Sequence, residues 1–247
     1  MKMCIKKGTA ILWAAFAVSA GVVRANSIVL TQNPYSYSVG GEFSAHVTGD
    51  NFVQNYAPAA TYNGDFETFC VEVAVDFNPG QTYTYSLSQF DSQGRALTLG
   101  AAYLYYEFAT GQLSTLAFDS SASGYDYTDT ATRNQDAGLL EAAFWALQGG
   151  QSYPGFPDLS TDQFYIDAVN KFGSLSGAQQ ASDGAYGVDI IQMWDGSNPA
   201  QNQLVYVPAP DSSSTALMFA GSAALVAFLA ARRRPAPARC AVRRSSR

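Results

Sequence analysis

The hydrophobic pattern of this chain changes its period twice, and that change constrains the fold more than any other feature. In Glu42–Val47 apolar and polar residues alternate, as in a half-buried strand with His46 on its polar face. Apolar residues then recur at helical spacing, and alternation returns near the end of the body. The expected strands are Ser27–Thr31, Glu42–Val47, Glu67–Phe77, Thr82–Leu87, Tyr186–Trp194 and Gln203–Val207, and the expected helices are Arg95–Phe108, Gly138–Leu147 and Thr161–Phe172. This order predicts an α+β fold, a single domain of antiparallel strands with two or three helices.

The first 25 residues have the features of a secretory signal peptide. Lys2, Lys6 and Lys7 precede the apolar run Ala10–Val23, and small or slim residues flank the end of that run. We expect signal peptidase to cleave after Ala25. An uncleaved N-terminal anchor is the alternative, but the apolar run is short for a bilayer.

The C-terminus predicts a transmembrane helix over residues 216–231. A helix of that length spans roughly 24 Å, slightly less than the bilayer core. Arg232, Arg233 and Arg234 follow it and favour a cytoplasmic location for the basic tail 235–247. The exported domain 26–206 would then lie on the other side of the membrane.

A short proline-containing motif precedes this helix and makes the signal more specific. The motif reads Val207-Pro208-Ala209-Pro210-Asp211-Ser212-Ser213. Together with the helix and the arginines, segment 207–234 resembles the PEP-CTERM class of sorting signals, most closely its VPDSG-type branch. The resemblance implies recognition by an exosortase-type membrane protease, with Val207, Pro208, Pro210, Asp211 and Ser212 in the recognised motif. Ala209-Pro210 is an extra pair relative to that branch. An ordinary single-pass anchor remains the alternative.

Charge is strongly segregated along the chain. Three basic against 20 acidic residues give the span Asn26–Asp211 a formal charge of −17. Phosphate backbones would repel such a body, so nucleic acid is not an expected partner. Asp126, Asp129 and Asp136 in the polar stretch Asp119–Asp136 could bind calcium, but their spacing differs from an EF-hand loop and a solvated loop is the simpler interpretation.

The body contains one cysteine, Cys70, and the chain contains one histidine, His46. An intradomain disulfide and multi-histidine zinc sites are therefore excluded. A Cys-His mechanism would require His46 beside Cys70, and no nucleophile-elbow motif is present. We expect no enzymatic activity and no cofactor.

Two short segments resemble the signature segments of bacterial surface thioester domains. They are Phe69-Cys70-Val71-Glu72 and Glu141-Ala142-Ala143-Phe144-Trp145. In that family a strand cysteine joins a helix glutamine with loss of ammonia. Here Glu141 occupies the glutamine position, so the resemblance implies a shared scaffold and a covalent adhesion module as the alternative function. The simpler interpretation is a buried, unreactive Cys70.

The leading prediction is a structural or adhesive, non-catalytic protein of the cell envelope, cell surface or extracellular matrix. Tyr103, Tyr105 and Tyr106 could form a glycan-facing surface, because tyrosine combines an apolar ring with a hydroxyl. Core packing explains the same residues equally well. Extracellular polysaccharide is the partner that this prediction names, besides signal peptidase and the sorting protease.

Overall fold

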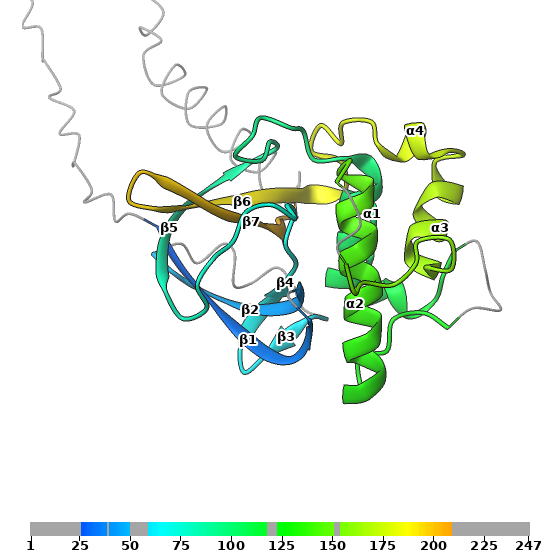
Figure 1. The fold of residues 1–247 in the computed structure, drawn as a ribbon, viewed down its shortest axis with the longest axis horizontal. Helices are drawn as coiled ribbons and strands as arrows, with labels where there is room; N and C mark the ends of the chain where they lie inside the picture. Colours follow the sequence, from blue (N-terminus) through cyan, green and yellow to red (C-terminus); the bar gives the residue numbers. More distant parts are fainter. Residues whose placement is uncertain (1–25, 39, 50–58, 118–122, 151–153, 209–247) are drawn as a thin grey trace, which may run out of the picture.

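A computed structural model describes residues 26–38, 40–49, 59–117, 123–150 and 154–208 of the chain (Figure 1). These residues form a seven-stranded sheet in the order β3-β4-β2-β1-β5-β6-β7, in which every neighbouring pair is antiparallel. The strands are β1 (Ser27–Tyr37), β2 (Gly40–Thr48), β3 (Thr61–Tyr62), β4 (Asp65–Thr68), β5 (Thr82–Ser88), β6 (Val188–Asp195) and β7 (Asn198–Tyr206).

The sheet closes on itself directly after β4. The N–H of Val71 donates to the carbonyl of Asn202 over 2.9 Å, and the N–H of Leu204 donates to the carbonyl of Phe69 over 3.1 Å. These bonds join the continuation of β4 to β7. Strands β4, β2, β1, β5, β6 and β7 therefore form a closed ring, which leaves few unpaired strand edges.

The helices gather on one side of the strands (Figure 1). They are α1 (Leu99–Ala109), α2 (Thr130–Leu147), α3 (Gln163–Lys171) and the short α4 (Leu175–Ala178). α2 packs on β1 and β2, whereas α1 packs on β6 and β7. The N-terminus of each is capped by a side chain, from Thr98, Asp129, Asp162 and Ser174 in turn. The predicted α+β class is confirmed.

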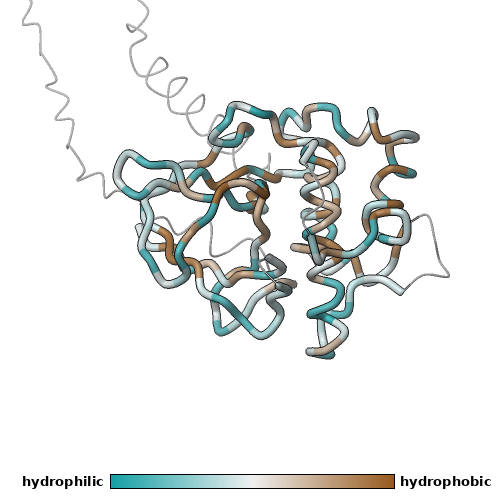
Figure 2. Tube along the Cα trace, in the orientation of Figure 1, coloured by the Kyte–Doolittle hydropathy of each residue, from teal (hydrophilic) through white to brown (hydrophobic). Residues whose placement is uncertain are grey.

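Aromatic side chains fill the space between the helices and the strands. Phe69, after β4, contacts Phe108 of α1 and Phe144 of α2, with ring centroids 5.0 and 5.2 Å apart. All three are fully buried. Figure 2 shows hydrophobic segments where the helices face the strands and hydrophilic loops around them. Burial of such large rings is the main stabilising contribution of this core.

Two predicted elements differ from the observed ones. The expected strand Glu67–Phe77 ends at Thr68, apart from the irregular pairing of residues 69–71 with β7. The expected loop Asp119–Asp136 contains the first two turns of α2, which begins at Thr130. The polar residues of this stretch gave no helical pattern of apolar residues, so the helix was not predicted there. At the centre of α2, Gly138 allows close contact with the Tyr37 ring, because a Cβ at this position would lie 2.5 Å from that ring.

The expected signal peptide, the sorting motif from Ala209 onward and the helix 216–231 lie outside the described residues. Within the part of the chain that the structure describes, none of the helices combines the length and apolarity needed to cross a membrane.

Candidate functional site around Cys70

Cys70 is fully buried at the junction that closes the ring of strands. It faces Gln203 of β7 as its partner in an antiparallel bridge. Nε2 of Gln203 donates a hydrogen bond to Sγ of Cys70 over 3.4 Å. Burial, followed by the charge of Glu141, raises the pKa of the Cys70 thiol well above its usual range. The thiol is therefore neutral at physiological pH.

Glu141 reaches the same place from α2. Its Oε2 accepts a hydrogen bond from the N–H of Cys70 over 3.4 Å, whereas its Oε1 is buried and makes no hydrogen bond. The absence of a side chain at Gly40 of β2 provides the space for Glu141, because a Cβ at Gly40 would lie 3.0 Å from Cγ of Glu141. Burial raises the pKa of the Glu141 carboxyl well above its usual range, although the N–H groups of Cys70 and Gly41 favour the charged form.

An apolar cluster covers Cys70. Phe43 of β2 and Trp145 of α2 are nearly fully buried and pack with Cys70. The Phe43 ring contacts Phe77 at 4.9 Å, and the Trp145 ring contacts Phe156 at 4.7 Å. Cys70, Glu141 and Gln203 therefore share a dry environment, in which electrostatic interactions are strong.

Glu72, the acidic residue of the cysteine motif, has a structural role. Its Oε2 accepts the N–H of Asn202 over 3.2 Å, and its Oε1 accepts the Ser92 hydroxyl over 3.1 Å. Its backbone carbonyl accepts Nε2 of Gln201 over 2.6 Å. These bonds hold β7 against the chain that follows Cys70, and so fix the position of Gln203.

The structure brings Cys70 and Glu141 together, as the two-segment resemblance implies, but it does not bring His46 to Cys70. His46 is about half exposed on β2, and its Nδ1 bonds Oδ1 of Asp65 over 2.8 Å. The His46 ring therefore bonds Asp65 at the surface, whereas the Cys70 thiol is buried and accepts a hydrogen bond from Gln203. The Cys-His alternative has no geometric basis here.

The acidic residues considered for calcium act as local caps instead. Asp126 accepts the N–H groups of Thr128 and Asp129, and Asp129 caps α2 through the N–H of Thr132. Asp136 accepts the N–H of Asp126 over 2.8 Å. In the described ranges, no three His, Cys, Asp or Glu side chains are grouped so that they could hold a metal ion.

Gln203 is the functional candidate that the sequence analysis missed. It lies 133 residues after Cys70 and belongs to no recognisable motif. Only closure of the sheet puts it opposite the thiol. Its Oε1 is buried and makes no hydrogen bond, and its Nε2 also donates to the backbone carbonyl of Gln201 over 3.4 Å.

Comparison with known proteins gives no assignment: no family model, no curated protein and no solved structure matches this chain.

Proposed function

We propose that this chain is an exported surface or matrix protein that is delivered by its C-terminal sorting signal and acts by binding. One observation carries the proposal furthest. The ring of strands that the structure describes is closed by β7 against residues 69–71, and it begins with β1 at Ser27 and ends with β7 at Tyr206, so both expected cleavage points lie outside it. Removal of both ends would therefore leave the domain intact.

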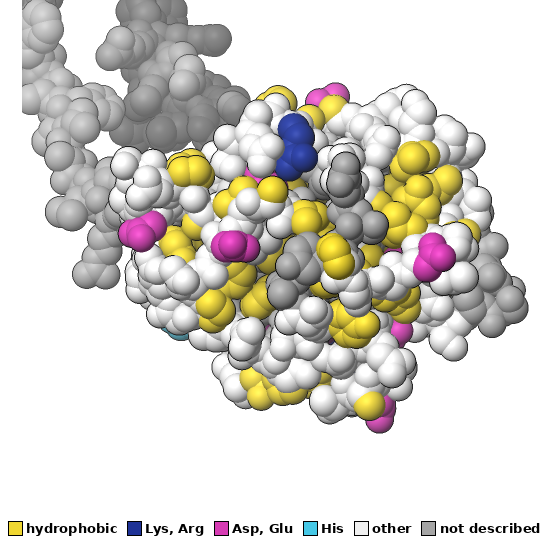
Figure 3. All heavy atoms as spheres, in the orientation of Figure 1, with side chains coloured by type: hydrophobic (Ala, Val, Ile, Leu, Met, Phe, Trp, Pro, Cys, Tyr) yellow, Lys and Arg dark blue, Asp and Glu magenta, His cyan; other side chains and the backbone are white. Residues whose placement is uncertain are grey.

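The charge distribution supports the same proposal. The acidic body and the basic ends are the arrangement expected when the ends direct translocation and the body remains in an aqueous exterior. On the face in Figure 3, acidic side chains are scattered over the surface and basic ones are scarce. Such a surface favours solubility after release.

Intact mass spectrometry of the protein purified from its native host tests the delivery. We expect loss of residues 1–25 and of the chain beyond a point within Pro208–Ser212, because the motif region is rich in proline and serine and would be accessible to a protease. A matched variant replaces Pro210, Asp211 and Ser212 by alanine and leaves the helix unchanged. It should retain the C-terminal helix.

Retention of helix 216–231 in the unaltered protein would show that segment 207–234 is an ordinary single-pass anchor and not a sorting signal. Retention of residues 1–25 would contradict export through signal peptidase. If the alanine variant were processed like the unaltered protein, the motif would not be the recognised feature.

The contacts of Cys70 favour a second candidate, a covalent adhesion module. The thiol has two buried acyl groups beside it, the carboxyl of Glu141 and the carboxamide of Gln203. Of the two, Gln203 is the better acyl donor, because ammonia leaves an acyl carbon more readily than hydroxide does. Glu141, with its raised pKa, is suited to move the proton.

The step balances without another reactant. Sγ of Cys70 attacks Cδ of Gln203, the C–N bond breaks, and the thiol proton passes through Glu141 to the departing amide nitrogen, which leaves as ammonia. The resulting internal thioester would be opened by an amine on a target surface. The target would become amide-linked to residue 203, and Cys70 would recover its thiol.

The mass of the processed body distinguishes the outcomes. A Cys70–Gln203 thioester lowers the mass by one ammonia, a Cys70–Glu141 thioester lowers it by one water, and an unreacted body keeps the full mass. We expect the loss of ammonia in the unaltered protein. Methylamine should then add its own mass and release one thiol to a labelling reagent.

Two variants control this experiment. Gln203→Met keeps the length of the side chain and removes the acyl group, so no mass should be lost and methylamine should have no effect. Glu141→Met keeps the length of that side chain, removes the proton carrier and supplies no acyl group of its own, so the ammonia loss from residue 203 should slow. An unmodified mass in the unaltered protein, with a thiol that reacts only after denaturation, would exclude the covalent candidate.

A further inference from the structure

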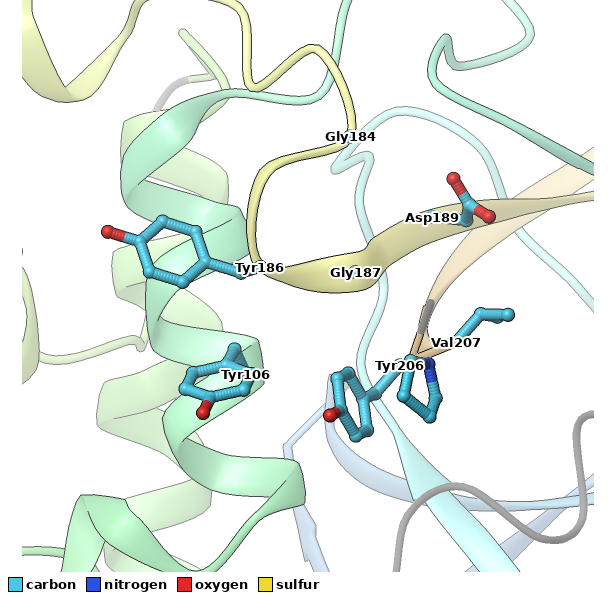
Figure 4. A pocket seen from close by; sticks show the side chains of 8 residues that line it. Tyr106, Gly184, Tyr186, Gly187, Asp189, Tyr206 and Val207 are labelled. Atoms are coloured by element: carbon cyan, nitrogen blue, oxygen red, sulfur yellow. The ribbon is translucent and has the colours of Figure 1, made fainter. Parts of the chain in front are cut away.

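An open pocket of about 610 Å³ lies where α1, the turn before β6 and the end of β7 meet (Figure 4). The pocket is unrelated to the Cys70 site and shares no lining residue with it. Its lining consists of Tyr106, Gly184, Tyr186, Gly187, Asp189, Tyr206, Val207 and Pro208. Pockets of this size with aromatic walls and a few polar groups are typical of ligand sites.

Three tyrosines form a continuous row along the pocket. The ring of Tyr106 lies between the other two, with centroid distances of 5.6 Å to Tyr186 and 5.5 Å to Tyr206 (Figure 4). Of the three tyrosines of α1, Tyr106 lines the pocket, whereas core packing accounts for Tyr103 and Tyr105. Tyr103 is buried but contacts the Tyr186 ring from the core, with ring centroids 5.8 Å apart, and Tyr105 lies wholly in the core.

The backbone holds Tyr186 in an unfavourable conformation. Its φ is 62°, in the left-handed region that aromatic residues rarely adopt. Gly187, also at positive φ, lies against β7, where a Cβ would be 2.8 Å from the carbonyl oxygen of Val207. Strain of this kind persists where the surroundings impose it, and it is frequent at ligand sites.

The charges of the pocket select against anions. Asp189 supplies a half-buried carboxylate, whose Oδ1 accepts the side-chain amide of Gln89, and no basic side chain is among the lining residues. The whole body is strongly acidic. The rings pack against each other in a row and do not surround a common point, so they offer a platform and not a cage for an ammonium group.

We propose that this pocket binds the neutral sugar units of an extracellular polysaccharide. The C–H face of a pyranose ring packs on the tyrosine row, and its hydroxyl groups exchange hydrogen bonds with the tyrosine hydroxyls and Asp189. This inference rests on the proposed surface or matrix role and names a binding partner for it. The pocket adjoins Val207 and Pro208, so the bound polymer would lie beside the point at which the sorting signal begins.

Calorimetric titration of the protein purified from its native host, in the form found there, tests the proposal. The probes are cellohexaose and chitohexaose as neutral chains, an alginate oligomer as an anionic chain, and choline as a cation. We expect saturable binding of at least one neutral chain, and no binding of alginate or choline. Binding of neither neutral chain, or preferential binding of alginate or choline, would overturn the proposal.

The variant Tyr186→Gly separates binding from folding. Glycine adopts a φ of 62° without strain, which offsets part of the packing lost with the ring. At a temperature where circular dichroism shows the variant folded, loss of the ring should weaken saccharide binding by about tenfold or more. Tyr62→Ala, which removes a tyrosine far from the pocket in the edge strand β3, should leave binding unchanged. Equal effects of the two variants would overturn the proposal.

The result of the saccharide-binding experiment can be distinguished from the result of the test of the proposed function. A processed protein that binds no neutral saccharide retains the surface role and loses this inference. An unprocessed protein that binds saccharide through Tyr186 retains this inference and loses the sorting account.

Discussion

Replacing Arg133 by methionine should lower the free energy of unfolding by about 3–5 kcal/mol, because it leaves a buried carboxylate without its counter-charge. Nε and an Nη of Arg133 each donate to Glu42 over 2.7 Å, and both side chains are nearly or fully buried. The guanidinium also donates to the carbonyl of Tyr127 and lies 3.8 Å from the centroid of the Tyr35 ring. Urea denaturation followed by fluorescence would measure the change.

Two further variants test the cause of that loss. Adding Glu42→Gln to Arg133→Met removes the unpaired charge, so the double variant should be more stable than Arg133→Met alone. Arg95→Met breaks the pair with Asp91, in which Arg95 is 39% exposed and the buried carboxylate keeps the N–H groups of Gln93 and Arg95 as partners, so it should cost less than Arg133→Met. If Arg95→Met and Arg133→Met had the same effect, burial of the Glu42 pair would not be its source.

Local periodicity predicted the fold class but misplaced Glu42. Period-two alternation puts Glu42 and Ser44 on the polar face of β2 with His46, yet only His46 is exposed. α2 packs over β2 and supplies Arg133 as the partner of Glu42. An ion pair between residues far apart in the sequence does not alter the local pattern of polar and apolar residues. A strand face that carries a buried ion pair therefore shows the same alternation as a face exposed to solvent.

The candidate site was also predictable only where a local sequence motif marks its residues. The two short segments around Cys70 and Glu141 indicated that a strand cysteine and a helix carboxyl would meet, and they do. Gln203 could not be found in this way, since its role depends on the register of β7 against the chain after β4. The tyrosine row of the pocket likewise combines residues from α1, the turn before β6 and β7, and only one of them was singled out.

Glu67 should make the protein less stable at alkaline pH than at acidic pH. This carboxyl accepts the Ser44 hydroxyl over 2.9 Å and an amide hydrogen bond from Asn33, but it lies beside Glu42. Burial, followed by the charge of Glu42, raises the pKa of Glu67 to about 8. The folded state therefore binds a proton at this site that the unfolded chain releases near the ordinary glutamate pKa of 4.5. Its stabilising contribution is complete below that value and is lost as pH rises through about 8.

Thermal unfolding measured at a series of pH values tests this expectation. Glu67→Gln should flatten the decline between pH 4.5 and about 8, by up to about 1.4 kcal/mol per pH unit, which is the contribution of one proton. The remaining slope should come from other carboxyls with raised pKa, such as Asp162 at about 7 and Asp136 at about 6. Asp158→Asn is the matched control, because hydrogen bonds from Ser160 lower the pKa of this exposed carboxyl and its titration lies below the window. A Glu67→Gln protein whose stability still declined with the original slope would show that Glu67 is ionised in the fold throughout that range, and that its hydrogen bonds to Ser44 and Asn33 outweigh burial.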